Sequence, residues 1–257
     1  MKPKIGRRHL IIPDTQIQPG VPLNHITWAA KAIRKYKPDV ICVLGDWWDM
    51  HSLNSYDKPG SKRMEGARYA EDIKAGNDAM AVLTSSILSL KEWPECHFFM
   101  GNHEDRITRA INAEPKFSGT ISLKDLDLKA FEVHDYLEVV NIDGVFYSHY
   151  FSNTHSSYPI GGSIDNRLNK IGESFVQGHQ QGFQYGTRVY PTGKTRHGLV
   201  AGSFYLHDED YRGPQNNNHW NGIVVLNEVE DGDYNIMPLG MNYLRATFGT
   251  KKEQSSA

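Results

Sequence analysis

Three short motifs in the first half of the chain place carboxylate, amide and imidazole side chains directly after runs of apolar residues. They are Asp14-Thr15-Gln16, the segment 45–49 (Gly-Asp-Trp-Trp-Asp) and the segment 101–104 (Gly-Asn-His-Glu). Two motifs in the second half each place a histidine after an apolar run: His149 and the segment 178–181 (Gly-His-Gln-Gln). Mixed oxygen and nitrogen donors of this kind suit Mn²⁺, Fe or Zn²⁺ better than Ca²⁺. The spacing therefore predicts a metal site built from several loops.

Apolar periodicity predicts the elements that would position these motifs. Apolar runs at residues 9–12, 40–44 and 96–100 predict buried strands. Helical spacing predicts helices over residues 24–36 and 67–90, and the alternation of strand and helix favours parallel pairing with helical crossovers. Because ligands bind beyond the carboxyl ends of parallel strands, we expect the motifs to meet at one edge of the sheet.

The second half of the chain favours strands, with few convincing helices. Its short apolar runs predict strands at residues 145–149, 174–177, 199–204, 222–226 and 234–238. The acidic segment 227–233 suits a hairpin turn. No linker-like change of composition divides the chain, so residues 1–250 are predicted to form one domain, followed by a disordered tail at 251–257.

The candidate metal ligands are seven residues: Asp14, Gln16, Asp46, Asn102, His149, His179 and Gln181. Each residue alone is weak evidence for a metal site. An aspartate after a strand, for example, is most often a turn or helix-cap residue. The set is much stronger, because five motifs arrive in order and each ends a predicted strand. Among the other histidines, His25 and His51 are weaker candidates for the rim of the site.

The combination of motifs resembles the calcineurin-like metallophosphoesterases. That family's signature runs Asp-x-His, Gly-Asp-x-x-Asp, Gly-Asn-His-Glu, a histidine, and Gly-His-x-His. The resemblance covers residues 9–182, and the wording at residues 14–16 and 178–181 is similar to the bacteriophage-encoded branch. It implies an α/β, four-layer fold: a β-sandwich of two mixed sheets flanked by helices, with the metals at one edge.

The resemblance also implies how two metals would be shared. Asp46 would bridge them, and Asn102, His149 and His179 would complete one position.

Asp14 would bind the other metal, where this chain has Gln16 and Gln181 in place of the family's two histidines. An amide oxygen is a weaker ligand than imidazole for transition metals. The sequence therefore predicts one tight and one weaker site, with Mn²⁺ preferred and Mg²⁺, Fe, Zn²⁺ or Ni²⁺ as alternatives.

The chemistry implied is attack of a metal-activated water on phosphorus. His103 would stabilise the transition state or protonate the leaving oxygen, and Asp49 would orient it. Asn102 would also donate to a phosphate oxygen. Arg106 is a candidate phosphate contact, or else a surface arginine, and Glu104 is expected to cap the following helix.

The favoured function is a metal-dependent phosphoesterase, a hydrolase acting as a phosphodiesterase or nuclease on nucleic acid or nucleotides. The loop at residues 51–66 interleaves basic and aromatic residues, and Trp47 and Trp48 lie inside the metal motif, which suits a single nucleic-acid strand or a nucleotide. The alternative is a solvated loop with buried tryptophans. The loop at residues 205–220, with Arg212, is a second candidate for lining the cleft. The competing functions are a Ser/Thr-type protein phosphatase, a general phosphomonoesterase, or a catalytically weakened binding protein.

Composition sets outer limits on these functions. The 257 residues carry 28 Lys+Arg against 30 Asp+Glu, a net charge of −2, which excludes a wholly basic nucleic-acid binder but not a local basic groove. No apolar stretch approaches about 18 residues, and the N-terminal apolar run is too short for a signal peptide. Cys42 and Cys96 lie in apolar runs and read as buried thiols. We expect a cytoplasmic protein, in the host cytoplasm if phage-encoded, whose partner is a phosphoester such as DNA, RNA or a nucleotide and not a membrane.

Overall fold

Two mixed β-sheets form the framework of this computed structural model, which describes residues 6–58, 60–156, 158–207 and 219–255. The first sheet contains β1 (Arg7–Ile12), β2 (Val40–Val43), β3 (Glu95–Phe99), β4 (Glu132–His134), β10 (Gly222–Glu230) and β11 (Asp233–Gly240). The second contains β5 (Val140–Ile142), β6 (Val145–Ser148), β7 (Phe175–Gln177), β8 (Phe183–Val189) and β9 (Thr195–Ala201). Their spatial orders are β11-β10-β1-β2-β3-β4 and β5-β6-β7-β9-β8.

Parallel pairs occupy the centre of both sheets, as the sequence predicts for the first half of the chain. In the first sheet β1, β2, β3 and β4 are parallel neighbours, and β10 and β11 add antiparallel strands at one side. In the second sheet β6, β7 and β9 are parallel, with β5 and β8 antiparallel at the edges. The carboxyl ends of the central strands therefore point to a common edge within each sheet.

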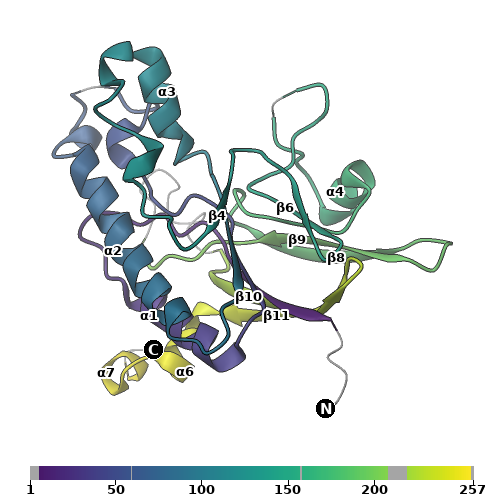
Figure 1. Cartoon of the computed structure of the whole chain (residues 1–257). Helices are drawn as coiled ribbons and strands as arrows, with labels where there is room; N and C mark the ends of the chain where they lie inside the picture. Colours follow the sequence, from purple (N-terminus) through teal and green to yellow (C-terminus); the bar gives the residue numbers. More distant parts are fainter. Residues whose placement is uncertain (1–5, 59, 157, 208–218, 256–257) are drawn as a thin grey trace.

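Helices cover the outer faces of the two sheets (Figure 1). The first sheet is covered by α1 (Asn24–Tyr36), α2 (Tyr69–Leu88) and α6 (Met241–Phe248), and the second by α4 (Ile164–Ile171). The remaining helices are α3 (Asp105–Ala113) and α7 (Lys251–Gln254), with short 3₁₀ turns η1 (His51–Leu53), η2 (Lys62–Met64), η3 (Pro115–Phe117) and η4 (Leu123–Asp125). The layers run helix, sheet, sheet, helix, which confirms the α/β fold class of two mixed sheets flanked by helices.

The continuous apolar runs of the central strands arise because both of their faces are buried. Successive side chains of a strand point to opposite faces. Leu10 and Ile12 pack with the helices, whereas Ile11 packs between the sheets, and Ile41 and Cys42 on β2 divide in the same way. Neither face needs polar residues, so the usual alternation is lost.

Several elements differ from the sequence predictions. The strands β4, β5 and β8 and the helices α4 and α6 were not expected, because they are short or lack a continuous apolar run. Residues 251–254, in the segment for which the sequence predicts a disordered tail, form α7 with a capping box between Thr250 and Glu253. Residues 256–257 lie outside the described part of the chain.

None of the helices in the described ranges is long and apolar enough to cross a membrane. The assignment of residues 1–250 to one domain stays a prediction.

Candidate metal centre

The predicted site residues lie in loops that follow the carboxyl ends of five strands. In chain order these strands are β1, β2, β3, β6 and β7, and the residues that follow them are Asp14, Asp46, Asn102, His149 and His179. Backbone hydrogen bonds tie the loops together: the Thr15 and Gln16 amides donate to the Asp46 carbonyl at 3.0 and 2.8 Å, and the Gly178 amide donates to the His149 carbonyl at 3.0 Å. The convergence expected from the sequence is therefore present.

Four side chains meet at short range in this region. The Asn102 Oδ1 lies 2.8 Å from His179 Nδ1 and 3.0 Å from His149 Nε2, and Asp46 Oδ2 lies 3.5 Å from the same His149 nitrogen. One ligand atom each from Asp46, His149 and His179 lies within 4.8 Å of the others, so these residues form a candidate cluster for a divalent metal. The His149 Nδ1 donates to the Leu44 carbonyl at 2.6 Å, so Nε2 is the ring nitrogen that faces the cluster.

The electrostatics keep these groups in their metal-binding forms. Burial opposes ionisation of Asp46, but the charges of His103 and His149 outweigh it and lower the pKa of Asp46 to about 2. Burial and the neighbouring His149 lower the pKa of His179 to about 4, so this imidazole is neutral near pH 7. A carboxylate and a neutral imidazole are the states that bind metal without first losing a proton.

A second group of oxygens beside this cluster lacks protein partners. Asp14 Oδ1 accepts the His179 amide at 2.9 Å, but Asp14 Oδ2 and Gln16 Oε1 are buried with no hydrogen-bond partner among the described residues. Burial and the charge of Asp46 raise the pKa of Asp14 well above its usual range. Buried unpaired oxygens and two repelling carboxylates are both costly, and a cation would relieve both.

Gln181 is placed differently from Gln16. Its Oε1 accepts a hydrogen bond from the Tyr205 hydroxyl at 2.8 Å. One lone pair of this carbonyl is therefore occupied within the protein, whereas the Gln16 oxygen is unpartnered.

Glycines allow the loops to approach this closely. A Cβ on Gly45 would lie 2.6 Å from the Gly101 nitrogen, and one on Gly101 would lie 2.2 Å from Asp46 Oδ1. A Cβ on Gly178 would lie 2.4 Å from Asp14 Oδ1. Each glycine thus stands directly against another loop of the centre, where no side chain fits.

His103 lies beside the cluster and faces a carboxylate of its own. Its Nδ1 is 3.2 Å from Asp49 Oδ1, and its Nε2 is 3.9 Å from Asp46 Oδ2. Burial opposes protonation, but Asp46 and Asp49 outweigh it and raise the pKa of His103. Arg106 is half-buried here and is not a free surface arginine: its Nη1 donates to the Asp49 and Met50 carbonyls at 2.7 and 3.2 Å, and its Nη2 lies 3.1 Å from His103 Nε2.

Glu104 does not cap the following helix, contrary to the sequence expectation. It is fully buried, and its carboxylate accepts backbone hydrogen bonds from Asp46, Trp47, Trp48 and Gly101 at 2.7–3.1 Å. No side-chain capping bond to α3 is present. Glu104 therefore fixes the loop that carries Asp46 against the loop that carries Asn102.

The two tryptophans of the metal motif are buried and do not form a stacking surface. Both are 0% exposed, and their indole nitrogens donate to carbonyls of α2, Trp47 to Gly76 at 3.0 Å and Trp48 to Ile73 at 3.4 Å. Of the rim candidates, His25 is buried against Phe204, with ring centroids 5.1 Å apart.

His51, the other rim candidate, is half-exposed and uses Nε2 on the Arg63 carbonyl at 2.7 Å. Much of the second candidate loop, residues 208–218 with Arg212, lies outside the described residues.

Aromatic residues that the sequence analysis missed surround the imidazoles. The Tyr150 ring lies 4.6 Å from the His179 ring, and its hydroxyl is 3.0 Å from that of Tyr136. Tyr150 follows His149 directly, and that adjacency was the available signal. Nothing in the sequence pointed to Tyr136 or Tyr205.

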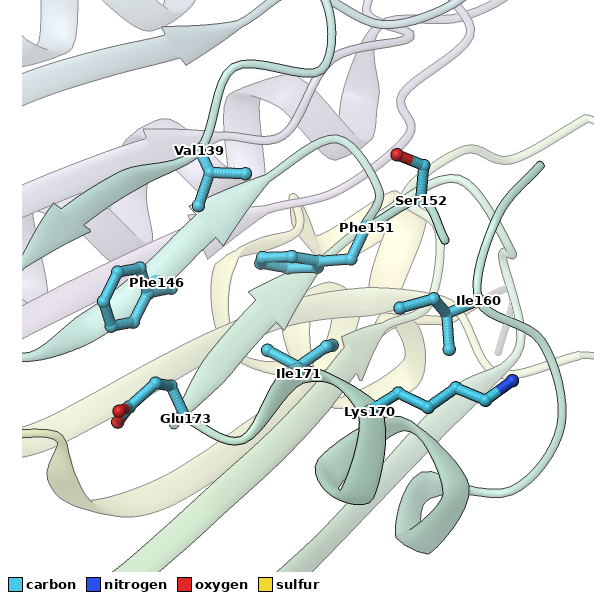
Figure 2. Close-up of a pocket in the computed structure, with 8 residues that line it drawn as sticks. All are labelled: Val139, Phe146, Phe151, Ser152, Ile160, Lys170, Ile171 and Glu173. Atoms are coloured by element: carbon cyan, nitrogen blue, oxygen red, sulfur yellow. The ribbon is translucent and has the colours of Figure 1, made fainter. Parts of the chain in front are cut away.

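A pocket elsewhere in the molecule is unrelated to this centre. Figure 2 shows it between β6 and α4, on the outer face of the second sheet. The residues that line it are Val139, Phe146, Phe151, Ser152, Ile160, Lys170, Ile171 and Glu173, and no predicted site residue is among them.

Comparison with known proteins leaves the family open. No protein-family model matches the sequence, and no curated protein matches it. Among solved structures, the chain is similar to the NAD nucleotidase NadN of Haemophilus influenzae, with 11% identity and a TM-score of 0.40 over 91% of this chain. The match covers 49% of that protein, so the chain spans about half of its length. So low a similarity says nothing about activity, and membership of the calcineurin-like family and its bacteriophage branch stays a prediction.

Proposed function

We propose that this chain is a metal-dependent hydrolase of phosphoester bonds, with its reaction centre around Asp46, His149 and His179. The observation that carries the proposal is one carboxylate and two imidazoles within 4.8 Å of one another, beside a third imidazole, His103, that faces Asp49. A metal-binding group next to a separate proton donor is the combination that phosphoryl transfer to water requires.

The donor set fits two divalent cations of unequal affinity. The tighter position would use Asp46, Asn102, His149 and His179, and the weaker one Asp14, Gln16, Asp46 and Gln181. The unpartnered oxygens of Asp14 and Gln16 support the second position. Because its donors are all oxygens, we expect Mn²⁺ to serve there first, with Mg²⁺, Fe, Zn²⁺ or Ni²⁺ as alternatives.

The protein's own side chains supply the rest of the chemistry. When bound, divalent metals polarise the phosphoryl group and lower the pKa of water. His103 is the proton donor to the leaving oxygen, and Asp49, 3.2 Å from its Nδ1, orients the ring. The amide nitrogen of Asn102 is a donor for a phosphate oxygen, and Arg106 adds positive charge beside His103.

A nucleic acid or nucleotide is the proposed substrate, acted on as a phosphodiester. The loop at residues 51–66 begins directly after Met50, whose carbonyl accepts a hydrogen bond from Arg106 at 3.2 Å. It exposes the side chains of Tyr56, Lys58 and Lys62. Cationic and aromatic side chains together bind the backbone and bases of a single strand. The burial of Trp47 and Trp48 leaves this loop as the main support for the choice.

An assay with three substrates tests the proposal. The metal-free protein would be supplied with Mn²⁺ and given bis-p-nitrophenyl phosphate, p-nitrophenyl phosphate or a phosphoserine peptide. Faster turnover of the diester is expected. Preference for either monoester would support a phosphoester hydrolase but contradict the proposed nuclease activity. No turnover of any substrate would contradict the proposal that the protein is an enzyme.

Two variants make the assay specific to the centre. His179→Ala removes an imidazole from the cluster and should abolish nearly all turnover. His155→Ala removes an exposed imidazole that the centre does not include and should leave turnover unchanged. Equal activity in the two variants would show that the metal is not held as proposed.

A further inference from the structure

A second group of side chains that could hold a metal ion lies on the neighbouring strands β3 and β4. It consists of His97, Glu132 and His134, which offer ligand atoms within 4.8 Å of one another. Both histidines are buried, at 3% and 4% exposure, whereas Glu132 is exposed. The group shares no residue with the centre around Asp46.

The register of the sheet brings these side chains together. β3 and β4 are parallel, with His97 opposite Glu132 and Phe99 opposite His134. Alternate residues of a strand share a face, so Glu132 and His134 point to the same side as His97. The His134 ring also packs on the Phe99 ring at 4.7 Å, which holds it on that face. The ligands are thus positioned by paired strands and not by a mobile loop.

Two of the three ligand separations lie close to what one tetrahedral ion requires. His97 Nδ1 lies 2.9 Å from His134 Nε2 and 3.6 Å from Glu132 Oε2. Ligands at the usual zinc distances of about 2.0–2.2 Å stand about 3.4 Å from one another in a tetrahedron. The two observed separations bracket that value.

The outer nitrogens of both rings face carboxylates, which bears on where the protons lie. His97 Nε2 is 3.0 Å from Glu95 Oε1, and His134 Nδ1 is 3.8 Å from Glu138 Oε1. A neutral imidazole carries one proton, and each carboxylate draws it to the nitrogen that faces it. With both protons on the outer nitrogens, the inner nitrogens of His97 and His134, which lie 2.9 Å apart, would present two lone pairs to each other. Two lone pairs repel at that distance unless a proton or a metal ion lies between them.

We propose that His97, Glu132 and His134 bind a single divalent transition-metal ion of the zinc class, with the fourth position open to water beside Glu132. Glu95 and Glu138 would hold the ring orientations from behind, as carboxylates commonly do for metal-bound histidines. The positive charge of Arg7 is offset, because Arg7 pairs with Glu95 and with Asp143. The ion would fasten the three-residue edge strand β4 to β3.

Metal titration of the full chain tests this site. Metal-free protein would be titrated with Zn²⁺ by calorimetry and with Co²⁺ by visible absorption, which reports tetrahedral nitrogen and oxygen coordination. The variants are Glu132→Gln, His97→Gln and Glu95→Gln, with the exposed Glu92→Gln as a matched control. Glu132 is exposed, so its variant should fold normally.

We expect the ligand variants to lose this zinc site and to keep the hydrolytic activity. Glu132→Gln and His97→Gln should each lose one zinc equivalent and its cobalt absorption, while turnover in Mn²⁺ is kept. Glu95→Gln should lower the affinity for that zinc ion by about 10–100-fold, the usual effect of removing a carboxylate that holds a ligand in place. The control should bind as the wild type does.

One result would overturn the proposal. If Glu132→Gln and His97→Gln both bind the same number of zinc ions as the wild type, with the same affinity and the same cobalt spectrum, then these residues hold no metal. That result would leave the proposed hydrolase untouched, because the centre around Asp46 contributes no residue to this site.

Discussion

The surroundings of two histidines in the same centre shift their pKa values in opposite directions. His103 lies beside Asp46 and Asp49, and its pKa is raised. His179 is affected most by burial and by the nearby His149, which lower its pKa to about 4. Groups whose environments separate their pKa values are suited to different roles, one carrying a proton and the other a lone pair.

Replacing His103 tests this division. His103→Asn removes the proton donor but none of the proposed metal ligands, so kcat should fall about 10²–10⁴-fold while metal content stays at the wild-type level. Metal analysis alongside steady-state kinetics checks both. Loss of metal in proportion to activity would make His103 a ligand.

The paired glutamines give a second prediction at this scale. Gln16→His with Gln181→His should tighten the weaker metal, because imidazole is a better donor than an amide oxygen to a transition metal. The change at position 181 also removes the acceptor for the Tyr205 hydroxyl, so Gln16→His alone is the cleaner first step. Calorimetric titration of the metal-free protein with Mn²⁺ gives both affinities. Two equally tight sites in the natural sequence would contradict the assignment.

At the scale of elements, the sequence predicted what local patterns determine. The helix at residues 24–36 has the bounds predicted, and both ends of α2 lie within two residues of their predicted positions, because apolar spacing is a local signal. Neither helix has a side-chain hydrogen bond at its N-cap, so the expected cap at or just before Asn24 is wrong. The strand β4, Glu-Val-His, has no apolar run at all. Its place depends on pairing with β3, which a local pattern does not contain.

The candidate centre shows the same limit. Its candidate ligands could be named from the sequence because each follows a predicted strand. The partners of Glu104 were not, because four backbone amides from two separate loops have no sequence signature.

The contact between Gly76 of α2 and Trp48 sets helix propensity against a steric clash. The sign of the change in the free energy of unfolding shows which effect is larger. Helix propensity alone would make Gly76→Ala stabilising by about 1 kcal/mol. However, a Cβ on Gly76 would lie 1.9 Å from Trp48 Cδ1, and Trp48 is fully buried. We expect the clash to dominate and the free energy of unfolding to fall by about 1–3 kcal/mol.

Chemical denaturation checks the Gly76 prediction. The control is Ser85→Ala, an exposed position in the same helix, which should change stability by less than about 0.5 kcal/mol. A more stable Gly76→Ala protein would show that Trp48 moves freely, contrary to its packing here.

At the scale of the whole molecule, buried histidines outside the centre make stability depend on pH. Burial, chiefly, lowers the pKa of His9 to about 4 and that of His25 to about 3. Their pKa in the unfolded chain is near 6.5, so the unfolded state binds more protons below that pH. The stability contribution is therefore complete above pH 6.5 and is lost progressively as the pH falls towards 4 and 3.

Each buried histidine should cost about 2 kcal/mol at pH 5 relative to pH 7, from 1.36 kcal/mol per pKa unit. His25→Leu removes one titrating group and should flatten the decline by about that amount. Denaturation midpoints measured from pH 7.5 to 5 in both proteins check this. Parallel curves would mean that His25 binds protons equally in the folded and unfolded states.

The close contacts of Gly45, Gly101 and Gly178 with neighbouring loops limit how this centre could be grafted onto another protein. A Cβ on Gly45 would meet the Gly101 nitrogen at 2.6 Å, and one on Gly178 would meet Asp14 Oδ1 at 2.4 Å. The loops therefore form one structural unit. A scaffold that carries the candidate ligands without the three glycines would hold these side chains too far apart. Directed evolution of this protein should find its tolerated changes in the outer loops, and almost none at these glycine positions.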